Sequence, residues 1–562
     1  MEENQTASTT PESRIAELEA ALVAKDSLIG QLTHERDLLR ASHERLRLEL
    51  ELLKRRIFVA KAERVDTAQL ELEFAEKLAA LDRMGGLADL EQETGKPSSR
   101  RSRPKPTGRR DLRKAPLEEE RVEIKDPLCE ELVKTGKAER IGFDESCKLA
   151  YKRGGMRCLV IARTKYRAVN SRGRAQIETA QMPEETFARS LAAPSMLAHV
   201  AVQKYCDGMP LFRLEDRFTR DGYSIDRGTM CRWVEDAGAT LGATVLAAAR
   251  KDAMATAFCF ATDATGVAIQ PDPTPDKRRQ PCRRGHYFVL IADRDHVFFE
   301  YTPTETSTIV EAMFKSFSGY VQADAKSVYD VLFRAPEEKP PDDDILRIEV
   351  GCWSHARRKL WEATVAKSIV AREGLARVGR IFDVDEKLRG KPPDEIKRLR
   401  QIHLRPYLES FFVWAEEQYA VVREQRGLLR SALGYAVRQK DALMRVLDDG
   451  RLLLDNNRSE RELRRVAVGR KAWLFAYDDD HATSAGHLFS LIASARLHRL
   501  DPETYLRDMF RVLVHWPQDR YLELAPKYWA ATRARLDPTE LAAEIGTLTV
   551  PPPLPPDAPT AN

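Results

Sequence analysis

Three acidic residues stand where carboxylates can act on a polyanion. Near the C-terminal end, the run Asp455-Asn456-Asn457-Arg458-Ser459-Glu460-Arg461 places Glu460 at the start of a predicted helix rich in cations. Far upstream, Asp263 and Asp324 each follow a short apolar segment that predicts a β-strand ending at the acid. Three separated acids that converge in a basic setting predict a site where divalent metal ions meet a polyanion.

The chemistry that this pattern predicts is the cleavage and joining of phosphodiesters. Two Mg²⁺ ions about 4 Å apart can activate the attacking oxygen and stabilise the leaving one. Each Mg²⁺ takes only one or two protein carboxylates. Asp263, Asp324 and Glu460 are therefore candidates both for catalysis and for metal binding, with Mn²⁺ able to replace Mg²⁺.

Each acid also has a plainer interpretation, which the sequence leaves open. An aspartate after a strand is often a turn or cap residue, and Glu460 can pair with Arg464 one helical turn away. Asp455 or Asn456 would cap the helix. Rival carboxylates stand in predicted turns or loops: Asp293, Asp295, Asp478, Asp479 and Asp480.

Basic residues surround the candidate site in sequence and suit contacts with the phosphates of DNA. The candidate DNA-binding residues are His355, Arg357, Arg358, Lys359, Arg461, Arg464, Arg465, Arg470 and Lys471. Solvated helix faces explain any one of these cations equally well. Trp353, Trp473 and Phe475 can stack on an unpaired base, although core packing is the more ordinary role of each.

The elements that must position these residues form a multidomain α/β chain. Residues 12–57 carry an apolar heptad repeat typical of a coiled coil, which favours a homo-oligomer, and a second helix is expected over 67–83. The expected parts are N-terminal coiled-coil helices (1–92), a basic linker (93–118), a small strand-containing module (119–185), a helix-turn-helix-like segment (186–250), an α/β core (251–350) with a helical insertion (351–450), completion of the core (451–500), a C-terminal helical segment (501–548) and a Pro-rich tail (549–562).

Composition excludes two classes of protein. No apolar run reaches the roughly 18 residues of a membrane span, and the polar, acidic residues at the start of the sequence predict no signal peptide. The eight cysteines are scattered, with no Cys-x-x-Cys pair, so cytosolic thiols are expected. The net charge of +4 averages over basic clusters and acidic helices and argues little by itself.

Several motifs together resemble the transposases of the insertion-sequence 66 family of bacterial mobile elements. The resemblance covers nearly the whole chain, and the run from Asp455 to Lys471 is its most specific part. The other motifs are Lys204-Tyr205, Pro210-Leu211-Phe212-Arg213, Thr262-Asp263-Ala264-Thr265-Gly266, Gln322-Ala323-Asp324 with Tyr329, Gly351-Cys352-Trp353-Ser354-His355-Ala356-Arg357-Arg358-Lys359 and Asp501-Pro502-Glu503-Thr504-Tyr505-Leu506.

The resemblance implies an acid-triad transposase with a ribonuclease-H-like core and a helical insertion. It implies that Asp263, Asp324 and Glu460 bind the metal ions, that the enzyme cuts element ends, and that the freed 3′-hydroxyl attacks target DNA. The implied partners are double-stranded DNA at element ends and target, and accessory proteins of the same element. The implied location is the bacterial cytoplasm, at the nucleoid.

The sequence departs from the family at two places outside the core. Where the family has paired Cys-x-x-Cys knuckles, this chain has Cys129 alone, and Cys147 and Cys158 do not restore the spacing. A structural zinc is therefore not expected. Residues 56–64 also differ from the family's Phe-Gly-Arg-x-Ser-Glu pattern. These departures keep a non-catalytic, repressor-like DNA-binding protein open as the alternative, beside a nuclease that cuts without joining.

Overall fold

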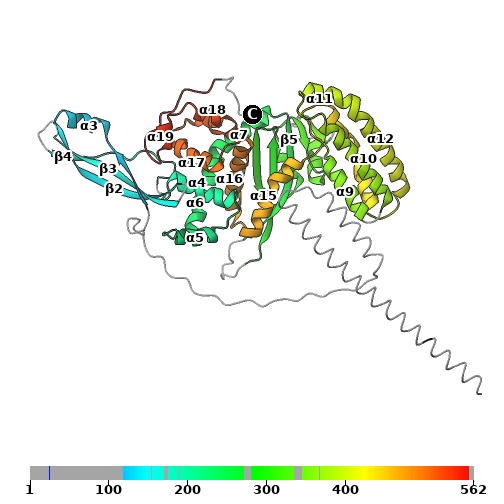
Figure 1. Cartoon of the computed structure of the whole chain (residues 1–562), viewed down its shortest axis with the longest axis horizontal. Coiled ribbons are helices and arrows are strands. Elements are labelled where there is room, and N and C mark those ends of the chain that lie inside the picture. The colour runs from blue at the N-terminus through cyan, green and yellow to red at the C-terminus, as the bar shows by residue number, and fades with distance from the viewer. Residues whose placement is uncertain are drawn as a thin grey trace, which may run out of the picture. The chain divides into compact units, whose positions relative to one another are not determined.

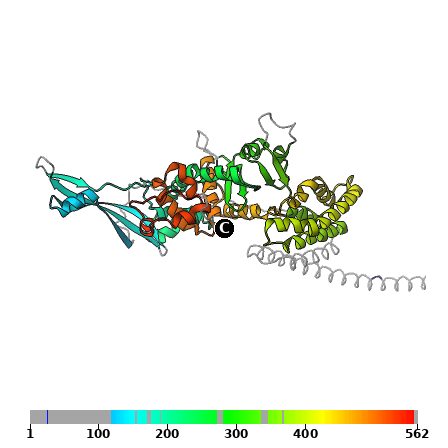
Figure 2. The same ribbon diagram turned by 90° about the horizontal axis from the view of Figure 1, so that it is seen from above.

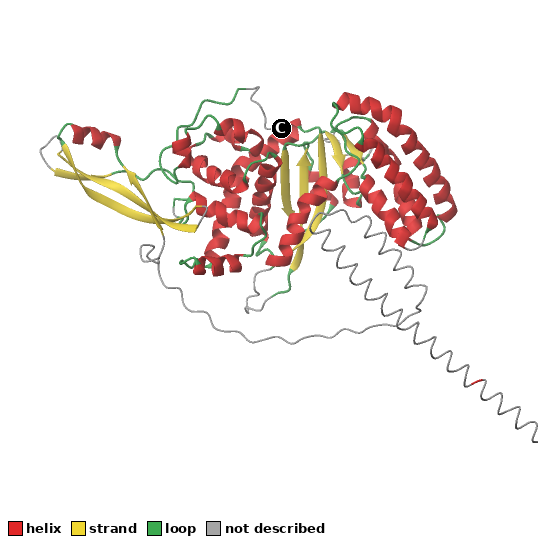
Figure 3. Cartoon of the chain, in the orientation of Figure 1, coloured by secondary structure: helices red, strands yellow, loops and turns green. Residues whose placement is uncertain are grey.

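The computed structural model describes Lys25 and residues 118–152, 155–169, 175–188, 190–270, 280–334, 345–365 and 368–555. The expected coiled coil over 12–57, the helix over 67–83 and the basic linker therefore lie outside the described residues, apart from the helical, exposed Lys25 and from Glu118. Among the described residues, no helix combines the length and the apolar composition that crossing a bilayer demands. Figure 1 labels the elements, and Figure 3 separates helices from strands.

The first described region is a strand-rich module. Its elements are β1 (Glu118–Ile124), α3 (Pro127–Lys134), β2 (Ala138–Lys152), β3 (Gly155–Val169) and β4 (Ala175–Thr179). The central strand β3 pairs with β2 and β4 in antiparallel fashion and with β1 in parallel. Leu149-Ala150-Tyr151 and residues 158–167 alternate or carry β-branched side chains, which predicts strands, and they lie in β2 and β3. Cys129 lies buried in α3, and its thiol donates to Glu178 at 3.3 Å.

A helical region follows. Pro194, Pro210 and Asp226 each predict the start of a helix, and three helices begin at or directly after these residues. The elements of the region are α4 (Pro194–Tyr205), α5 (Leu211–Arg220), α6 (Arg227–Leu241), a π-helical turn (Gly242–Leu246) and α7 (Ala247–Thr256). Proline suits the start of a helix because the first turn leaves its N–H groups unpaired. Pro194 is the first residue of α4, and Pro210 directly precedes α5. Asp226 caps α6 by accepting from the N–H groups of Gly228 and Thr229.

The second sheet carries two of the candidate acids. Its strands are β5 (Cys259–Ile269), β6 (Arg283–Ala292), β7 (His296–Thr302), β8 (Gly319–Gln322) and β9 (Arg347–Val350), with α8 (Ser307–Met313) between β7 and β8. In the described part of the chain its order is β7-β6-β5-β8-β9. β6 runs antiparallel to β5 and β7, whereas β5, β8 and β9 run parallel. Residues 286–292 and 296–301 predict a hairpin across Asp293-Arg294-Asp295, and β6 and β7 form it.

A long helical segment follows β9, as predicted, and it builds its own apolar core. Its elements are α9 (Trp353–Val365), α10 (Ile369–Glu386), α11 (Pro393–Leu399), a π-helical turn (Arg400–Leu404), α12 (Arg405–Val422), α13 (Leu428–Arg438), α14 (Lys440–Met444) and a 3₁₀ turn (Arg445–Leu447). Figure 2 shows α9–α14 packed together in one bundle. Trp353, Phe411 and Trp414 lie in its buried core.

The chain then returns to the second sheet. The returning elements are α15 (Asn457–Trp473), α16 (Asp479–Leu497), α17 (Pro502–Val512), 3₁₀ turns at Leu513–His515 and Gln518–Leu524, α18 (Pro526–Arg533) and α19 (Pro538–Ala542). α15 packs across β5 and β6, and α16 packs on β7. The hydroxyls of Ser490 and Ser494 accept from the N–H groups of Phe299 and Val297 at 2.7 and 2.9 Å. The helix α16 thus supplies hydrogen-bond acceptors to N–H groups of the edge strand β7.

The loop after β8 contains a strained residue. Ala325 has a φ of 55°, in the left-handed region that favours glycine. We expect Ala325→Gly to raise the free energy of unfolding by about 0.5–1 kcal/mol, because the relief of strain exceeds the added flexibility of the unfolded chain. Urea unfolding would measure the change. Its matched control is Ala323→Gly, two residues earlier, where a buried methyl group is lost and stability should fall. Equal losses from both variants would contradict the strain argument.

Candidate active site at the carboxyl end of strand β8

Asp263 lies within a strand rather than at its end, so the predicted end of this strand was wrong. β5 continues to Ile269 because β6 pairs with it along almost its whole length. On the other side, β5 pairs with the short strand β8 only over Cys259–Ala261. Asp263 therefore stands two residues beyond the last pair with β8, at the carboxyl end of that neighbouring strand.

Asp324 follows β8 directly, as predicted. Its side chain is only 10% exposed, and its Oδ2 lies 3.5 Å from the Lys326 ammonium. Its Oδ1 accepts from the backbone N–H of Lys326 at 3.4 Å. Because β5 and β8 are parallel neighbours, Asp263 and Asp324 emerge at the same edge of the sheet.

Glu460 reaches this edge from α15, and a buried asparagine fixes the start of that helix. The Asn456 amide donates to the carbonyl of Thr262 at 2.7 Å and accepts from the Ser459 hydroxyl at 2.7 Å. Asn456 thus ties α15 to the residue that precedes Asp263. Its side chain makes no helix cap, and Asp455 accepts from the N–H of Asn457 at 3.1 Å instead.

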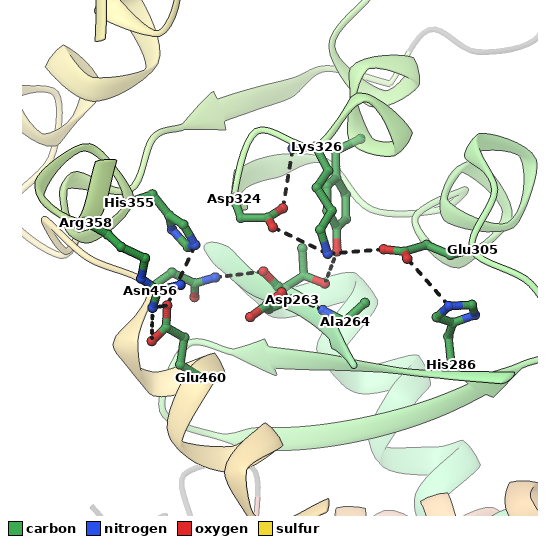
Figure 4. Close-up of polar contacts among 12 residues, drawn as sticks. Asp263, Ala264, His286, Glu305, Asp324, Lys326, His355, Arg358, Asn456 and Glu460 are labelled. Atoms are coloured by element: carbon green, nitrogen blue, oxygen red, sulfur yellow. Dashed lines mark hydrogen bonds and ion pairs between the residues drawn. The ribbon is translucent and has the colours of Figure 1, made fainter. Parts of the chain in front are cut away.

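The carboxylate of Glu460 faces the side chains of Arg358 and His355 from α9. Arg358 donates to its two oxygens at 3.2 and 3.3 Å, and His355 Nε2 lies 3.7 Å from Oε1. Figure 4 shows Glu460 beside Arg358 and His355, with Asn456, Asp263 and Asp324 in the same view. Burial lowers the pKa of His355, although the charges of Asp324 and Glu460 oppose this shift. The imidazole is therefore neutral near pH 7.

The electrostatics show that the acids act on one another. Burial, followed by the negative charge of Asp324, raises the pKa of Asp263 to about 6, and Glu460 adds to the shift. Burial opposes the charged form of Lys326, yet the carboxylates of Asp324, Glu305 and Asp263 raise its pKa overall. Within the described ranges, no three His, Cys, Asp or Glu side chains form a ready-made metal cage. The site is a set of interacting carboxylates with a lysine among them.

The candidate DNA-binding residues fall into two groups. Arg461, Arg464 and Lys471 are exposed on α15, and Arg357 and Arg358 are exposed on α9. Others make contacts inside the protein. Arg465 donates to Glu462 at 2.9 Å, and the half-buried Arg470 donates to Thr265 Oγ1 at 3.2 Å and to the carbonyl of Gly266. The Lys359 ammonium lies 5.3 Å from the centre of the Tyr435 ring.

The rival carboxylates have structural partners. Asp293 accepts from the N–H groups of Phe258 and Cys259 at 2.8 and 3.0 Å, and Asp295 pairs with Lys527 at 2.7 Å. Asp478 lies in the predicted loop and caps α16, whereas Asp479 and Asp480 lie in the first turn of that helix, so the predicted loop was wrong for these two. This aspartate run suits the positive end of a helix dipole.

Of the three aromatic candidates, one is clearly a core residue. Trp353 is fully buried and donates to the carbonyl of Leu443 at 3.0 Å. Trp473 is partly buried and packs against the large core. Phe475 is 42% exposed.

Three further polar residues build the site. Sequence reasoning named Gln322 only as part of a family motif and missed Lys326 and Glu305. Gln322, buried in β8, donates to the carbonyls of Gly351 and Leu453 at 3.3 and 2.8 Å, which ties β8 to the starts of α9 and α15. Lys326 and Glu305 form an ion pair at 3.3 Å beside Asp324. A glutamine inside an apolar strand was a signal for Gln322, and a lysine two residues after Asp324 was a weak one. Glu305 had none.

Comparisons with known proteins identify the family to which the chain belongs. The family model described as "Transposase IS66 family" matches residues 189–484, more than half of the chain, and the model described as "IS66 C-terminal element" matches residues 490–526. Three relatives come from Sinorhizobium fredii (strain NBRC 101917 / NGR234). Uncharacterized protein y4qI is 26% identical over 69% of this chain and 71% of its own length. Uncharacterized protein y4hP is 25% identical over 87% and 89%, and uncharacterized protein y4jD is 25% identical over 60% and 65%.

Membership of this family implies a role in transposition, and with it binding to DNA. The matched span includes β5, β8, α9 and α15, the elements that carry the three acids and their partners. On these grounds the chain belongs to the IS66 family of transposases.

Proposed function

We propose that this chain is an acid-triad transposase in which Asp263, Asp324 and Glu460 form the catalytic centre that cuts element ends and joins them to target DNA. The hydrogen bond from Asn456 to the Thr262 carbonyl carries the proposal, because it fixes the helix of Glu460 against the strand of Asp263. The second sheet supports a ribonuclease-H-like core. Its order β7-β6-β5-β8-β9, with β6 the antiparallel strand, suits two acids on adjacent parallel strands.

The donor set fits Mg²⁺, with Mn²⁺ as a substitute. Mg²⁺ prefers carboxylate oxygens and takes only one or two from a protein, leaving its other positions to water and substrate phosphates. The pKa of Asp263 is raised first by burial and then by the negative charge of Asp324, and a bound divalent cation would favour the ionised form against both. Asp263 and Asp324 would hold one ion, and Glu460 would complete the site for a second. Bound divalent ions stabilise the charge that develops on the attacking and leaving oxygens of the phosphodiester.

The protein's own residues would bind and orient the DNA. Exposed Arg461, Arg464 and Lys471 follow one another along α15 at spacings of three and seven residues, which place them on one side of the helix. Backbone phosphates lying along this side would present a scissile bond to the first turn, where Glu460 lies. Arg358 would keep Glu460 oriented until DNA and metal enter.

The other parts of the chain keep their predicted roles in this proposal. The helical region over 186–250 would recognise element ends, and the heptad repeat over 12–57 would join subunits into the complex that pairs two ends. The strand-rich module would support end recognition through its fold, since its cysteines lack zinc-knuckle spacing.

The test is a cleavage and strand-transfer assay on a supercoiled plasmid that carries the element's ends. Wild type with Mg²⁺ or Mn²⁺ is expected to give cut and joined products, and Glu460→Gln is expected to give none while still binding the ends. Arg405→Gln, an exposed change in the helical bundle, is the matched control. Products that persist in Glu460→Gln would refute the triad. Binding of ends without metal, and without products from wild type, would instead identify a non-catalytic DNA-binding protein.

A further inference from the structure

A lysine ammonium lies among the carboxylates of the candidate active site. Lys326 Nζ is 3.5 Å from Asp324 Oδ2 and 3.3 Å from Glu305 Oε1, and it also interacts electrostatically with Asp263. Figure 4 shows Lys326 between Asp324 and Glu305, on the side of Asp324 away from Glu460. The ammonium thus neutralises the same oxygens that a divalent cation would need.

A divalent cation and the Lys326 ammonium cannot both bind the carboxylate oxygens of the site with full affinity. A divalent ion on Asp263 and Asp324 would repel the ammonium a few ångströms away, and the ammonium would weaken the pull of the carboxylates on the ion. The binding free energy of the ion therefore includes the cost of displacing Lys326. That cost depends on where the ammonium can go.

Glu305 gives the ammonium a second partner. Its Oε1 faces Lys326, and its Oε2 lies 3.7 Å from His286 Nε2, so its carboxylate is held in place from the other side. The Lys326 side chain is 42% exposed, which leaves it room to move. Withdrawal toward Glu305 would free Asp324 without leaving the ammonium unpaired.

We propose that Lys326 is an internal competitor of the divalent cation, and that Glu305 is the partner that receives its ammonium when the cation binds Asp324. This inference rests on the proposed function, because it needs a metal site at Asp263 and Asp324. It assigns Lys326 and Glu305 to the positioning of metal rather than to contact with the reacting atoms.

The test measures Mn²⁺ binding to the full-length protein by electron paramagnetic resonance, with no DNA present. Lys326→Met keeps the length of the side chain and removes its charge, and it should bind Mn²⁺ about tenfold more tightly than wild type. Glu305→Gln should bind it about threefold more weakly, because the ammonium loses its second partner and stays on Asp324. In the double variant the Glu305→Gln change should have little further effect.

Two controls separate this inference from the proposed function. Lys315→Met removes an exposed charge outside the site and should leave Mn²⁺ affinity unchanged. Asp263→Asn should abolish the binding. If wild type binds Mn²⁺ no better than Asp263→Asn does, the metal site itself is wrong and both proposals fall. If Asp263→Asn loses binding but Lys326→Met binds no more tightly than wild type, the competitor role is refuted and the proposed function stands.

Discussion

Asp263→Asn is expected to lower strand transfer at least about 10³-fold and, at the same time, to make the protein more stable above pH 6. The loss of activity follows if the carboxylate holds a catalytic metal ion, because an amide is a much weaker ligand. The gain in stability follows from crowding, since the carboxylate is partly buried beside Asp324.

The direction of the pH effect follows from the raised pKa. The pKa of Asp263 is about 6 in the folded protein, against about 3.9 in an unfolded chain. The folded state therefore holds this proton more tightly, and the ionised group costs stability progressively as pH rises from about 4 to 6. The full cost, about 1–3 kcal/mol, is present above pH 6 and absent below pH 4. The amide keeps the hydrogen bond from the N–H of Ala264 and removes the charge.

Urea unfolding in EDTA at pH 4 and pH 7.5 would measure this difference. Asp537→Asn is the matched control with the opposite sign. Asp537 accepts from the N–H groups of Thr539 and Glu540, which lower its pKa, so its removal should destabilise the protein at pH 7.5. If Asp263→Asn is less stable than wild type at pH 7.5, the ionised carboxylate of Asp263 does not destabilise the folded protein, and this explanation is wrong.

Arg400→Met is expected to cost the helical bundle about 3–5 kcal/mol of stability. Arg400 is 3% exposed, and its Nε donates to Asp385 at 2.8 Å. Its Nη1 donates to the carbonyls of Val446, Asp449 and Leu452 at 2.9–3.2 Å. Methionine fills a similar volume but removes the donor from the buried Asp385 carboxylate and from the buried carbonyls of Val446 and Leu452, whereas the Asp449 carbonyl keeps the N–H of Leu452.

Two further variants would test the cause of this loss. Arg400→Lys keeps the charge but cannot reproduce the forked hydrogen bonds, so its stability should fall between those of wild type and Arg400→Met. Adding Asp385→Leu to Arg400→Met removes the stranded carboxylate and should recover part of the loss. Urea unfolding followed by tryptophan fluorescence reports on this bundle, because Trp353 and Trp414 lie in its core. A loss below 1 kcal/mol would contradict the buried-network interpretation.

Local sequence signals predicted most elements but not their full lengths. Pro194 at the start of α4 and Pro210 directly before α5 predicted those two helices, and the Asp293-Arg294-Asp295 turn predicted the β6–β7 hairpin. The strand end at Asp263 was missed because Ala264-Thr265-Gly266 carries no apolar alternation, and only pairing with β6 extends β5 through it. Local strand propensity cannot show which strand a segment pairs with, and here the pairing with β6 sets the length of β5.

The sequence predicted the three acids of the candidate site but not the residues that surround them. Asp324 follows a recognisable strand, and Glu460 sits among cations in a recognisable helix. Arg470 stands in the same kind of basic helical sequence as Arg464, yet it donates to β5. This contact results from the packing of α15 on the sheet, which local sequence does not predict. Glu305 carries no local signal, since its role depends on a lysine 21 residues later in a different loop.

The distance along the chain between the acids has a consequence for synthesis on the ribosome. Asp263 and Asp324 leave the exit tunnel well before Glu460, and the whole helical bundle is made in between. Ile269, the last residue of β5, forms a β-bridge with Ala476. Two N–H groups of β7 donate to Ser490 and Ser494, which are synthesised later still. A nascent chain therefore carries two of its acids on an unfinished sheet until nearly nine-tenths of the polypeptide exists. Any fragment that stops before residue 460 lacks the third acid and the cations of α15 that follow it.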